Sequence, residues 1–198
     1  MAEKKKRGRP RTFERDRAVS RALDHYWREG PLALSVNEFC RRMGMSKPSL
    51  YREFGGEDGL LAEALDRYWG SVLAPIAALL GPDRSFAEST EALIAFASDP
   101  GDTPKGCLLA KSRGTRDRLG PAAGARVDEL ARALRNAYEA VSRRGQERGE
   151  VRSDINSEFA ARYLDTQVTT ALHKVAAGED PDEVRAQTEL ALTALLPS

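Results

Sequence analysis

The sequence predicts an all-α protein in which a small N-terminal helical domain packs on a larger helical domain. Apolar residues recur at spacings of three and four along most of the 198-residue chain. Glycines and prolines gather between these stretches, and no segment shows the convincing alternation of a strand. We expect a disordered basic arm at residues 1–12, followed by domains at residues 13–56 and 57–198.

The first two helices have clear ends. The first is expected from about Glu14 to Glu29, where Gly30-Pro31 stops it. Ser35 is a good N-cap for the second helix, and Glu38 can reach back to its amide in a capping box. Gly44 can adopt the left-handed conformation that ends such a helix. Each helix has an apolar side, formed by Ala18, Ala22, Tyr26 and Trp27 in the first and by Val36, Phe39, Cys40 and Met43 in the second.

A third short helix follows after a tight turn. Ser46-Lys47-Pro48 is a favourable start, because proline in a first turn gives up only an amide that lacks a partner. Leu50 and Phe54, four residues apart, would bury one side of this helix. Donors on the outer face are typical of a recognition helix in the DNA major groove, although such hairpins also contribute to helical cores that never bind DNA. The polar residues left for solvent or a partner are Lys47, Ser49, Tyr51 and Arg52.

The rest of the chain is expected to be helical as well. Beyond Gly55-Gly56, a long helix runs from Glu57 to about Leu80, and Pro75 should kink it or end it early. A loop rich in proline and glycine occupies residues 99–104. The remaining helical stretches cover approximately residues 85–98, 105–118, 121–149, 157–177 and 181–196.

The last two stretches carry apolar rows that bear on assembly. Two adjacent helices with such rows could pair with a second copy as a four-helix bundle, or the rows could face the subunit's own core. A single short recognition helix contacts too few base pairs for useful specificity, which independently favours a homodimer. The rows are Phe159, Tyr163, Gln167, Ala171 and Val175, and Val184, Thr188, Ala191 and Leu195.

Charge is distributed unevenly along the chain. Residues 1–54 contain 14 Lys and Arg and 7 Asp and Glu, a net charge of +7 in a chain whose total is +1. The remainder therefore carries a net charge of −6. A basic N-terminal quarter on an acidic remainder indicates that one end of the molecule meets a polyanion.

The basic arm contains the extended cationic strip Arg7-Gly8-Arg9-Pro10-Arg11. This strip resembles the core of an AT hook, whose arginines lie in a narrow minor groove, or it is a solvated tail that adds nonspecific affinity. No apolar h-region follows the lysines, and no run approaches the roughly 18 apolar residues of a membrane span. Cys40 and Cys107 form neither a disulfide framework nor a zinc site, so we expect a cytoplasmic, nucleoid-associated protein without metal or cofactor.

The chain resembles the TetR family of bacterial transcriptional regulators. The resemblance rests on Gly44–Phe54 followed by a Gly-rich break and Leu60, and more weakly on the Arg-Gly-Arg-Pro arm and on Lys105–Leu109. It implies that the three N-terminal helices bind DNA and that the last two form a homodimer. It also implies a repressor on a pseudo-palindromic operator, released when a small-molecule effector enters the larger domain.

The resemblance assigns roles to individual positions. Ser49 and Arg52 should approach base edges, and Arg52 should dominate specificity because a guanidinium can bond guanine O6 and N7 together. Family members commonly have Lys at the position of Glu57, so a phosphate contact is expected to be absent there. Glu53, near the groove, could accept from a cytosine amine or discourage phosphate crowding. The expected DNA contacts are Ser35, Lys47, Pro48, Ser49, Tyr51 and Arg52, together with Arg7, Arg9 and Arg11 in the arm.

The effector is harder to predict. Aromatic residues at helical spacing fit a core as well as a cavity. Cys107 resembles the cysteine of family members that sense oxidants or electrophiles, and Lys105, Lys111 or Lys174 could lower its pKa; otherwise it is a small core residue. The candidate cavity residues are Trp69, Phe86, Phe96, Cys107, Tyr138, Tyr163 and Gln167.

Two other functions are less well supported by the sequence. An enzyme is not expected, because His25 and His173 fall on separate helices and no phosphate loop, nucleophile elbow or metal-ligand cluster is present. His25, next to Tyr26 and Trp27, reads as a packing residue. An AT-hook-type architectural protein would explain the arm but would leave the acidic helical remainder without a role.

Overall fold

The computed structural model describes residues 11–99, 101 and 103–197, apart from the side chains of residues 11–14. All regular secondary structure in this part of the chain is helical. The elements are α1 (Arg11–Glu29), α2 (Val36–Met43), α3 (Lys47–Phe54), α4 (Glu57–Tyr68), η1 (Trp69–Leu73), α5 (Ala74–Ala78), α6 (Phe86–Ser98), α7 (Leu108–Arg113), η2 (Arg116–Arg118), α8 (Pro121–Glu147), α9 (Ser157–Ala177), α10 (Pro181–Leu192) and η3 (Thr193–Leu195).

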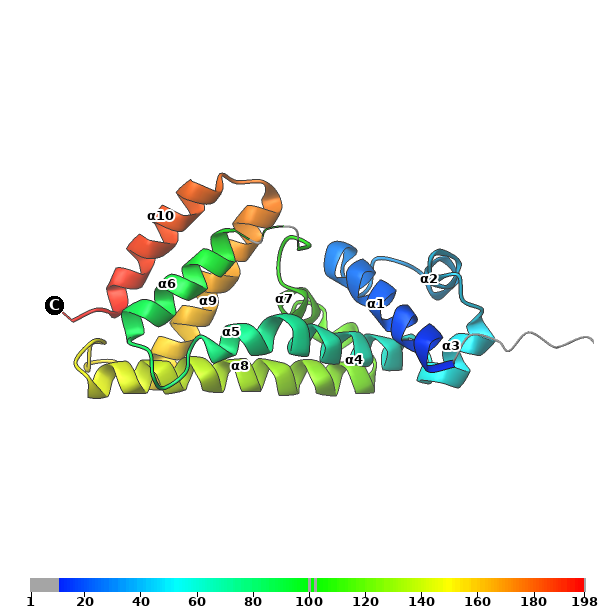
Figure 1. Cartoon of the computed structure of the whole chain (residues 1–198), viewed down its shortest axis with the longest axis horizontal. Helices are drawn as coiled ribbons and strands as arrows, with labels where there is room; N and C mark the ends of the chain where they lie inside the picture. Colours follow the sequence, from blue (N-terminus) through cyan, green and yellow to red (C-terminus); the bar gives the residue numbers. More distant parts are fainter. Residues whose placement is uncertain (1–10, 100, 102, 198) are drawn as a thin grey trace, which may run out of the picture.

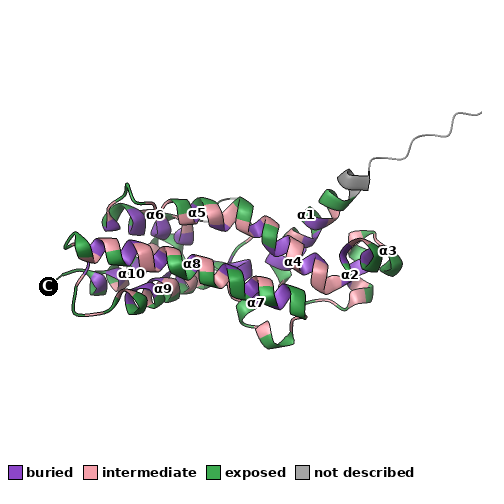
Figure 2. Ribbon diagram, turned by 90° about the horizontal axis from the view of Figure 1, so that it is seen from below, coloured by how far each residue is buried: buried purple, intermediate pink, exposed green. Residues whose placement is uncertain are grey.

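The helices form an elongated molecule with two unequal parts. Helices α1–α3 lie at one end, and α6, α9 and α10 lie at the other (Figure 1). Helix α8 runs along most of the larger part beside α4 and α5, and α4 packs against α1, α3 and α8. Buried residues lie on the inward sides of the helices along the whole length, in one continuous apolar cluster (Figure 2). Helix α4 therefore connects the two parts through a shared core.

Local sequence signals set the ends of α2. The Ser35 Oγ accepts the N–H of Glu38 at 3.3 Å, and Gly44 ends the helix at a φ of 65°. The expected capping box is only half formed, because the Glu38 carboxylate accepts hydrogen bonds from Arg41 and Arg42 instead. Arg41 and Arg42, one turn further along the helix, take up the carboxylate that would otherwise accept a hydrogen bond from the N–H of Ser35.

The long helix expected after Gly56 is disturbed directly before Pro75. Its α-helical part ends at Tyr68, and residues 69–73 form a π-helical turn before α5 begins. The N–H of Ala74 donates to the carbonyl of Trp69, five residues earlier. Proline has no N–H for the following bond, so a widened turn in front of it is the local consequence. The disturbance expected at Pro75 is thus a π-helical turn in the residues directly before it.

Several boundaries differ from those expected, and the helical stretch expected at residues 105–118 is interrupted between α7 and η2. Helix α1 begins at Arg11, so that the arm is shorter than twelve residues. Helix α7 begins only at Leu108, because Gly106 adopts a φ of 82° that a helix does not allow. The final helix ends at Leu192 and continues as a 3₁₀ turn. No helix in the described part of the chain is long and apolar enough to cross a membrane.

The apolar rows of α9 and α10 lie mainly inside the subunit and not on its surface. Most of their residues are buried within the subunit: Ala171, Val175, Val184, Thr188 and Leu195. Phe159, the first residue of the α9 row, is exposed, and outside the rows α10 exposes Leu190, which leaves 72% of its surface accessible. Of the two roles that the sequence left open for these rows, most of their residues therefore have the second, which is to pack in the subunit's own core.

Candidate nucleic-acid interface and internal cavity

Helix α3 exposes one polar face. Leu50 and Phe54 are buried, as their spacing predicts, and Ser49 is half-buried. The Ser46 Oγ accepts the N–H of Ser49 at 3.2 Å, and the N–H of Gly55 donates to the carbonyl of Tyr51, so that both ends of the helix are capped. Tyr51 leaves 59% of its surface exposed, which is unusual for a large aromatic residue. The exposed members of this face are Lys47, Pro48, Tyr51 and Arg52.

Arg52 is held by its neighbours on α3. Its Nε donates to the Glu53 carboxylate at 2.9 Å, and its Nη2 donates to the Ser49 Oγ at 3.4 Å. The sequence placed Glu53 near the groove with two possible roles. The structure adds a third, in which Glu53 orients the guanidinium that is expected to read bases.

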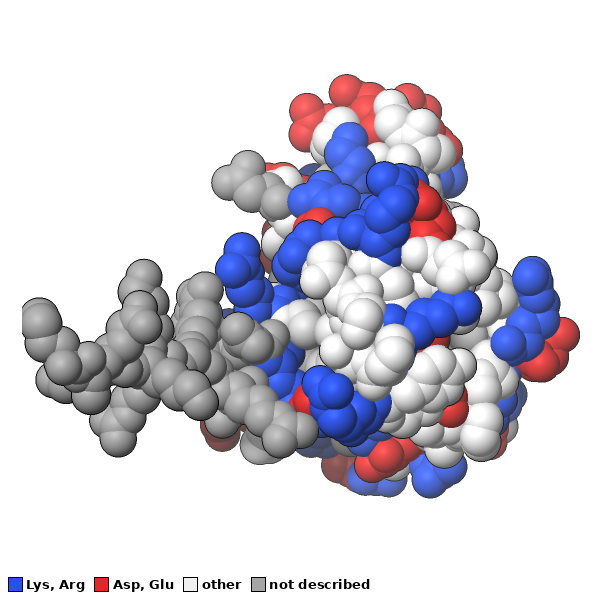
Figure 3. Space-filling view, turned by 90° about the vertical axis from the view of Figure 1, so that its right-hand side faces the viewer, with Lys and Arg blue, Asp and Glu red and all other residues white. Residues whose placement is uncertain are grey.

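An open groove of about 540 Å³ separates α1 from the turn between α2 and α3. Arg15, Arg17 and Arg21 line its α1 side, and Ser49 and Arg52 line the other side. Lys and Arg side chains are spread between uncharged areas over this end of the molecule (Figure 3). Arg15, Arg17 and Arg21 were not among the expected DNA contacts. Their only signal in the sequence is the number of arginines in one short helix, which does not show where they point.

The remaining expected contacts are partly outside the described residues. Ser35 is exposed at the start of α2. Arg7 and Arg9 lie outside the described part of the chain, and so does the side chain of Arg11. Glu57 is half-buried, and burial raises the pKa of its carboxyl group above the ordinary value of 4.5.

A small cavity lies inside the larger part, with a volume of about 20 Å³, which is room for little more than one water molecule. Of the expected residues, Phe96, Cys107 and Tyr138 line it. The sequence missed a polar element of its wall, the ion pair between Arg113 and Asp165 at 2.8 Å. These partners are 52 positions apart, so only the fold reveals them.

The other four candidates lie elsewhere. Trp69, Phe86, Tyr163 and Gln167 are not part of the cavity wall. Phe86 packs near Gly145 at the far end of α8. The hydroxyl of Tyr163 donates to the carbonyl of Ala191 at 2.9 Å and so joins α9 to α10.

Cys107 has a raised pKa, contrary to the lowered one that a reactive thiol requires. Only 7% of the residue is exposed, and burial is the main cause of the raised pKa. The Tyr68 hydroxyl donates to its Sγ at 3.4 Å. Lys111, one of the cations expected to activate the thiol, donates instead to the carbonyl of Trp27 at 2.5 Å and to that of Arg28 at 3.2 Å. In this conformation the thiol is a core group.

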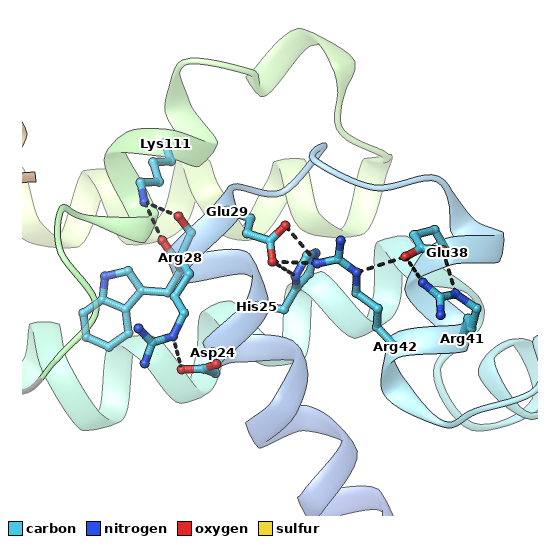
Figure 4. Close-up of polar contacts among 9 residues, drawn as sticks. Asp24, His25, Arg28, Glu29, Glu38, Arg41, Arg42 and Lys111 are labelled. Atoms are coloured by element: carbon cyan, nitrogen blue, oxygen red, sulfur yellow. Dashed lines mark hydrogen bonds and ion pairs between the residues drawn. The ribbon is translucent and has the colours of Figure 1, made fainter. Parts of the chain in front are cut away.

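Lys111 also joins the two parts of the molecule. Its ammonium group lies at the last turn of α1, where carbonyls lack helical partners (Figure 4). Beside it, the indole N–H of Trp27 donates to the carbonyl of Gly106 at 2.7 Å. The wall of the cavity and the end of α1 are therefore connected through α7 as well as through α4.

The histidines show no arrangement that suggests catalysis or metal binding. His25 is buried with its ring 5.5 Å from that of Phe39 and its Nδ1 3.3 Å from the Glu29 carboxylate, which confirms that it is a packing residue. Among the described residues there is no group of three or more His, Cys, Asp or Glu that could hold a metal ion.

Comparison with known proteins gives consistent matches. Residues 19–64 match the model of bacterial regulatory proteins of the tetR family, and residues 84–190 match the tetracyclin repressor-like C-terminal domain. The HTH-type transcriptional repressor ComR of Escherichia coli (strain K12) is 31% identical over 172 residues, which cover 81% of this chain and 79% of ComR. The repressor BdcR of the same strain is 30% identical over 155 residues, covering 76% of this chain and 77% of BdcR.

Solved structures show the same fold. A TetR-family regulator from Agrobacterium tumefaciens has a TM-score of 0.81 at 20% identity and covers 94% of this chain and 99% of its own. A cysteine mutant of the TetR-family regulator CifR, in complex with a 26-bp double-stranded operator, has a TM-score of 0.76 at 26% identity. The match covers 95% of this chain and all of CifR (100%).

Proposed function

The chain belongs to the TetR family of bacterial transcriptional regulators, and on that premise we propose that it is a dimeric repressor released from its operator by a small-molecule effector. It is a DNA-binding regulator and not an enzyme, as its relatives indicate. Two relatives are repressors, and one neighbour binds a 26-bp operator, which supports repression from a site long enough for two recognition helices.

The observation that carries this proposal is the outer face of α3. The helix is capped at both ends, buried on one side through Leu50 and Phe54, and exposes Lys47, Tyr51 and Arg52 on the other. A rigid helix with exposed donors fits a major groove, and the bidentate guanidinium of Arg52 would give the strongest preference for a base. Residues 13–56 are the DNA-binding domain in this proposal, and residues 57–198 bind the effector and the second subunit.

Dimer formation is proposed to use the outer surfaces of α9 and α10. Phe159 and Leu190 are large apolar residues exposed there. A two-fold axis through this surface would allow two copies of α3 to enter successive major grooves about 34–36 Å apart. Such a protein acts in the cytoplasm on chromosomal DNA. In this proposal the basic arm, with Arg7 and Arg9, adds contacts in the minor groove.

The effector is proposed to act by enlarging the closed cavity. About 20 Å³ is far below the roughly 300 Å³ or more of ordinary ligand pockets, so a ligand must stabilise a more open arrangement. Phe96 and Tyr138 offer apolar contacts, and Arg113 and Asp165 offer a polar pair. Opening would move α4 and α7, both of which contact α1. A ligand that binds the open form more tightly than the closed form therefore weakens DNA binding.

Selection from a random double-stranded DNA library tests the DNA-binding part of this proposal. The purified protein and the Arg52→Ala variant are carried through the selection side by side. We expect the wild type to enrich an inverted repeat that Arg52→Ala does not enrich. If both proteins recover the same A·T-rich tracts, the arm does the binding and the assignment of α3 is wrong.

A further inference from the structure

Arg21 lies on α1, yet its guanidinium completes the end of α2. Its Nη2 donates to the carbonyl of Arg42 at 2.7 Å and its Nη1 to the carbonyl of Met43 at 2.9 Å. These are the last two carbonyls of α2 and have no partner within the helix. The two carbonyls before them accept the N–H groups of Gly44 and Met45. Arg21 therefore supplies the hydrogen bonds to the carbonyls of Arg42 and Met43 that the backbone N–H groups of the turn do not make.

The turn that Arg21 fixes leads directly into α3. Only Met45 separates Gly44 from the N-cap Ser46. Any rotation of the last turn of α2 would therefore change the direction in which α3 leaves. A forked guanidinium that bonds two adjacent carbonyls resists such rotation more than a single hydrogen bond does.

A second contact between the same helices supports this reading. The Arg42 side chain, whose own carbonyl accepts from Arg21, donates from Nη1 to the Glu29 carboxylate at 2.8 Å (Figure 4). The end of α2 is thus joined to α1 through both its backbone and a side chain. Across the groove from Arg21 lie Ser49 and Arg52, the residues expected to reach base edges.

We propose that Arg21 is a positioning residue for sequence-specific DNA recognition, which sets the orientation of α3 by capping α2 and does not itself bind a phosphate. This inference rests on the proposed function, since it concerns the operator that the wild-type protein selects. It predicts that loss of Arg21 lowers the affinity for the operator more than the affinity for unrelated DNA.

The test compares Arg21→Met with Arg17→Met, which removes the same charge from the same groove without touching the turn. Dissociation constants are measured on the selected operator and on a scrambled duplex of equal length, over a range of salt concentrations and well below each variant's melting temperature. For Arg21→Met we expect a loss of about tenfold in the ratio of operator to scrambled affinity, with an unchanged salt slope on scrambled DNA. For Arg17→Met we expect an unchanged ratio.

A conservative variant separates positioning from general stability. Arg21→Lys should keep most of the ratio, because an ammonium group can cap a helix end in the way that Lys111 caps α1. If Arg21→Met is not folded at the assay temperature, Arg21→Gln takes its place, because its shorter, uncharged amide keeps N–H donors but lacks the charged guanidinium fork.

Two results would overturn the inference. One is an unchanged affinity ratio in Arg21→Met. The other is a salt slope on scrambled DNA that becomes shallower by about 0.9, the value for one lost phosphate contact. Failure of the wild type to select an inverted repeat would instead reject the proposed function, so the two failures are distinguishable.

Discussion

Glu57 shows how a single residue can combine a favourable position with an unfavourable environment. It lies in the first turn of α4, where the helix dipole favours a negative charge, but the carboxyl group is half-buried and its pKa is raised by burial. A raised pKa in the folded state favours the protonated form. The contribution of this group to stability is therefore fully present below the ordinary pKa of 4.5 and is lost as the pH rises through the raised value.

The variant Glu57→Gln tests this consequence. At pH 7 it should raise the melting temperature by about 1–3 °C, because it removes a desolvated charge. The difference from the wild type should shrink toward zero as the pH is lowered to about 4, where Glu57 is itself neutral. Calorimetry over this pH range measures the effect, with the exposed Glu147→Gln as control. A Glu57→Gln protein that is less stable at pH 7 would show that the carboxylate is stabilising.

Cys107 shows that the charged residues near a thiol do not by themselves predict its pKa. The sequence left open whether nearby lysines activate this thiol or whether it is a small core residue, and in the structure Lys111 turns away to the end of α1 and the thiol is buried beside Tyr68. Desolvation by burial outweighs the hydrogen bonds from Tyr68 and from the backbone N–H groups of Ala110 and Leu109, so the pKa of the thiol rises. The direction of a pKa shift depends on burial, and the types of residue nearby in the sequence do not show whether a group is buried.

At the scale of helices, α3 and α4 meet at a glycine. A Cβ atom added to Gly59, in the first turn of α4, would overlap the carbonyl oxygen of Phe54, the last residue of α3. No side chain can be moved aside to relieve this contact, because both groups belong to the backbone. The close approach fixes the relative placement of the recognition helix and the helix that connects it to the larger domain.

Gly59→Ala should therefore separate α3 from α4. We expect a destabilisation of about 1–3 kcal/mol, measured by thermal unfolding, and a loss of operator affinity in the fraction that remains folded. Gly70→Ala is the matched control, since a Cβ at Gly70 meets nothing within 4 Å and alanine favours a helix. Equal stability and DNA binding in both variants would contradict the importance of this contact.

At the scale of the whole molecule, the proposed function requires a second copy. The exposed Leu190 on α10 and Phe159 on α9 mark the surface on which we expect that copy to bind. Leu190→Glu should produce monomers in light-scattering measurements, because a buried unpaired carboxylate opposes association. Operator affinity should fall with the loss of the second recognition helix.

Leu32→Glu serves as the control for this experiment. Leu32 is also exposed and apolar, but it lies between α1 and α2 at the DNA-binding end. Its variant should remain dimeric. If Leu190→Glu also remains dimeric at low protein concentration, the outer surface of α10 is not the interface.

The sequence by itself determined the features that depend on neighbours within about four residues. The all-helical class, the caps at Ser35 and Ser46, the end of α2 at Gly44 and the exposed face of α3 all follow from local spacing, and the structure has them. Such features need only the geometry of one helix, because capping side chains and i, i+4 neighbours lie on the same or the next turn.

Only the tertiary structure decided which faces are buried and which distant groups meet. It assigned the rows of α9 and α10 to the core, excluded Trp69 and Phe86 from the cavity wall, and brought Arg21 to the end of α2. An apolar row has the same sequence pattern whether it packs inside a subunit or against another one. Burial and long-range hydrogen bonds depend on how helices cross, and that information is not contained in the spacing along any one of them.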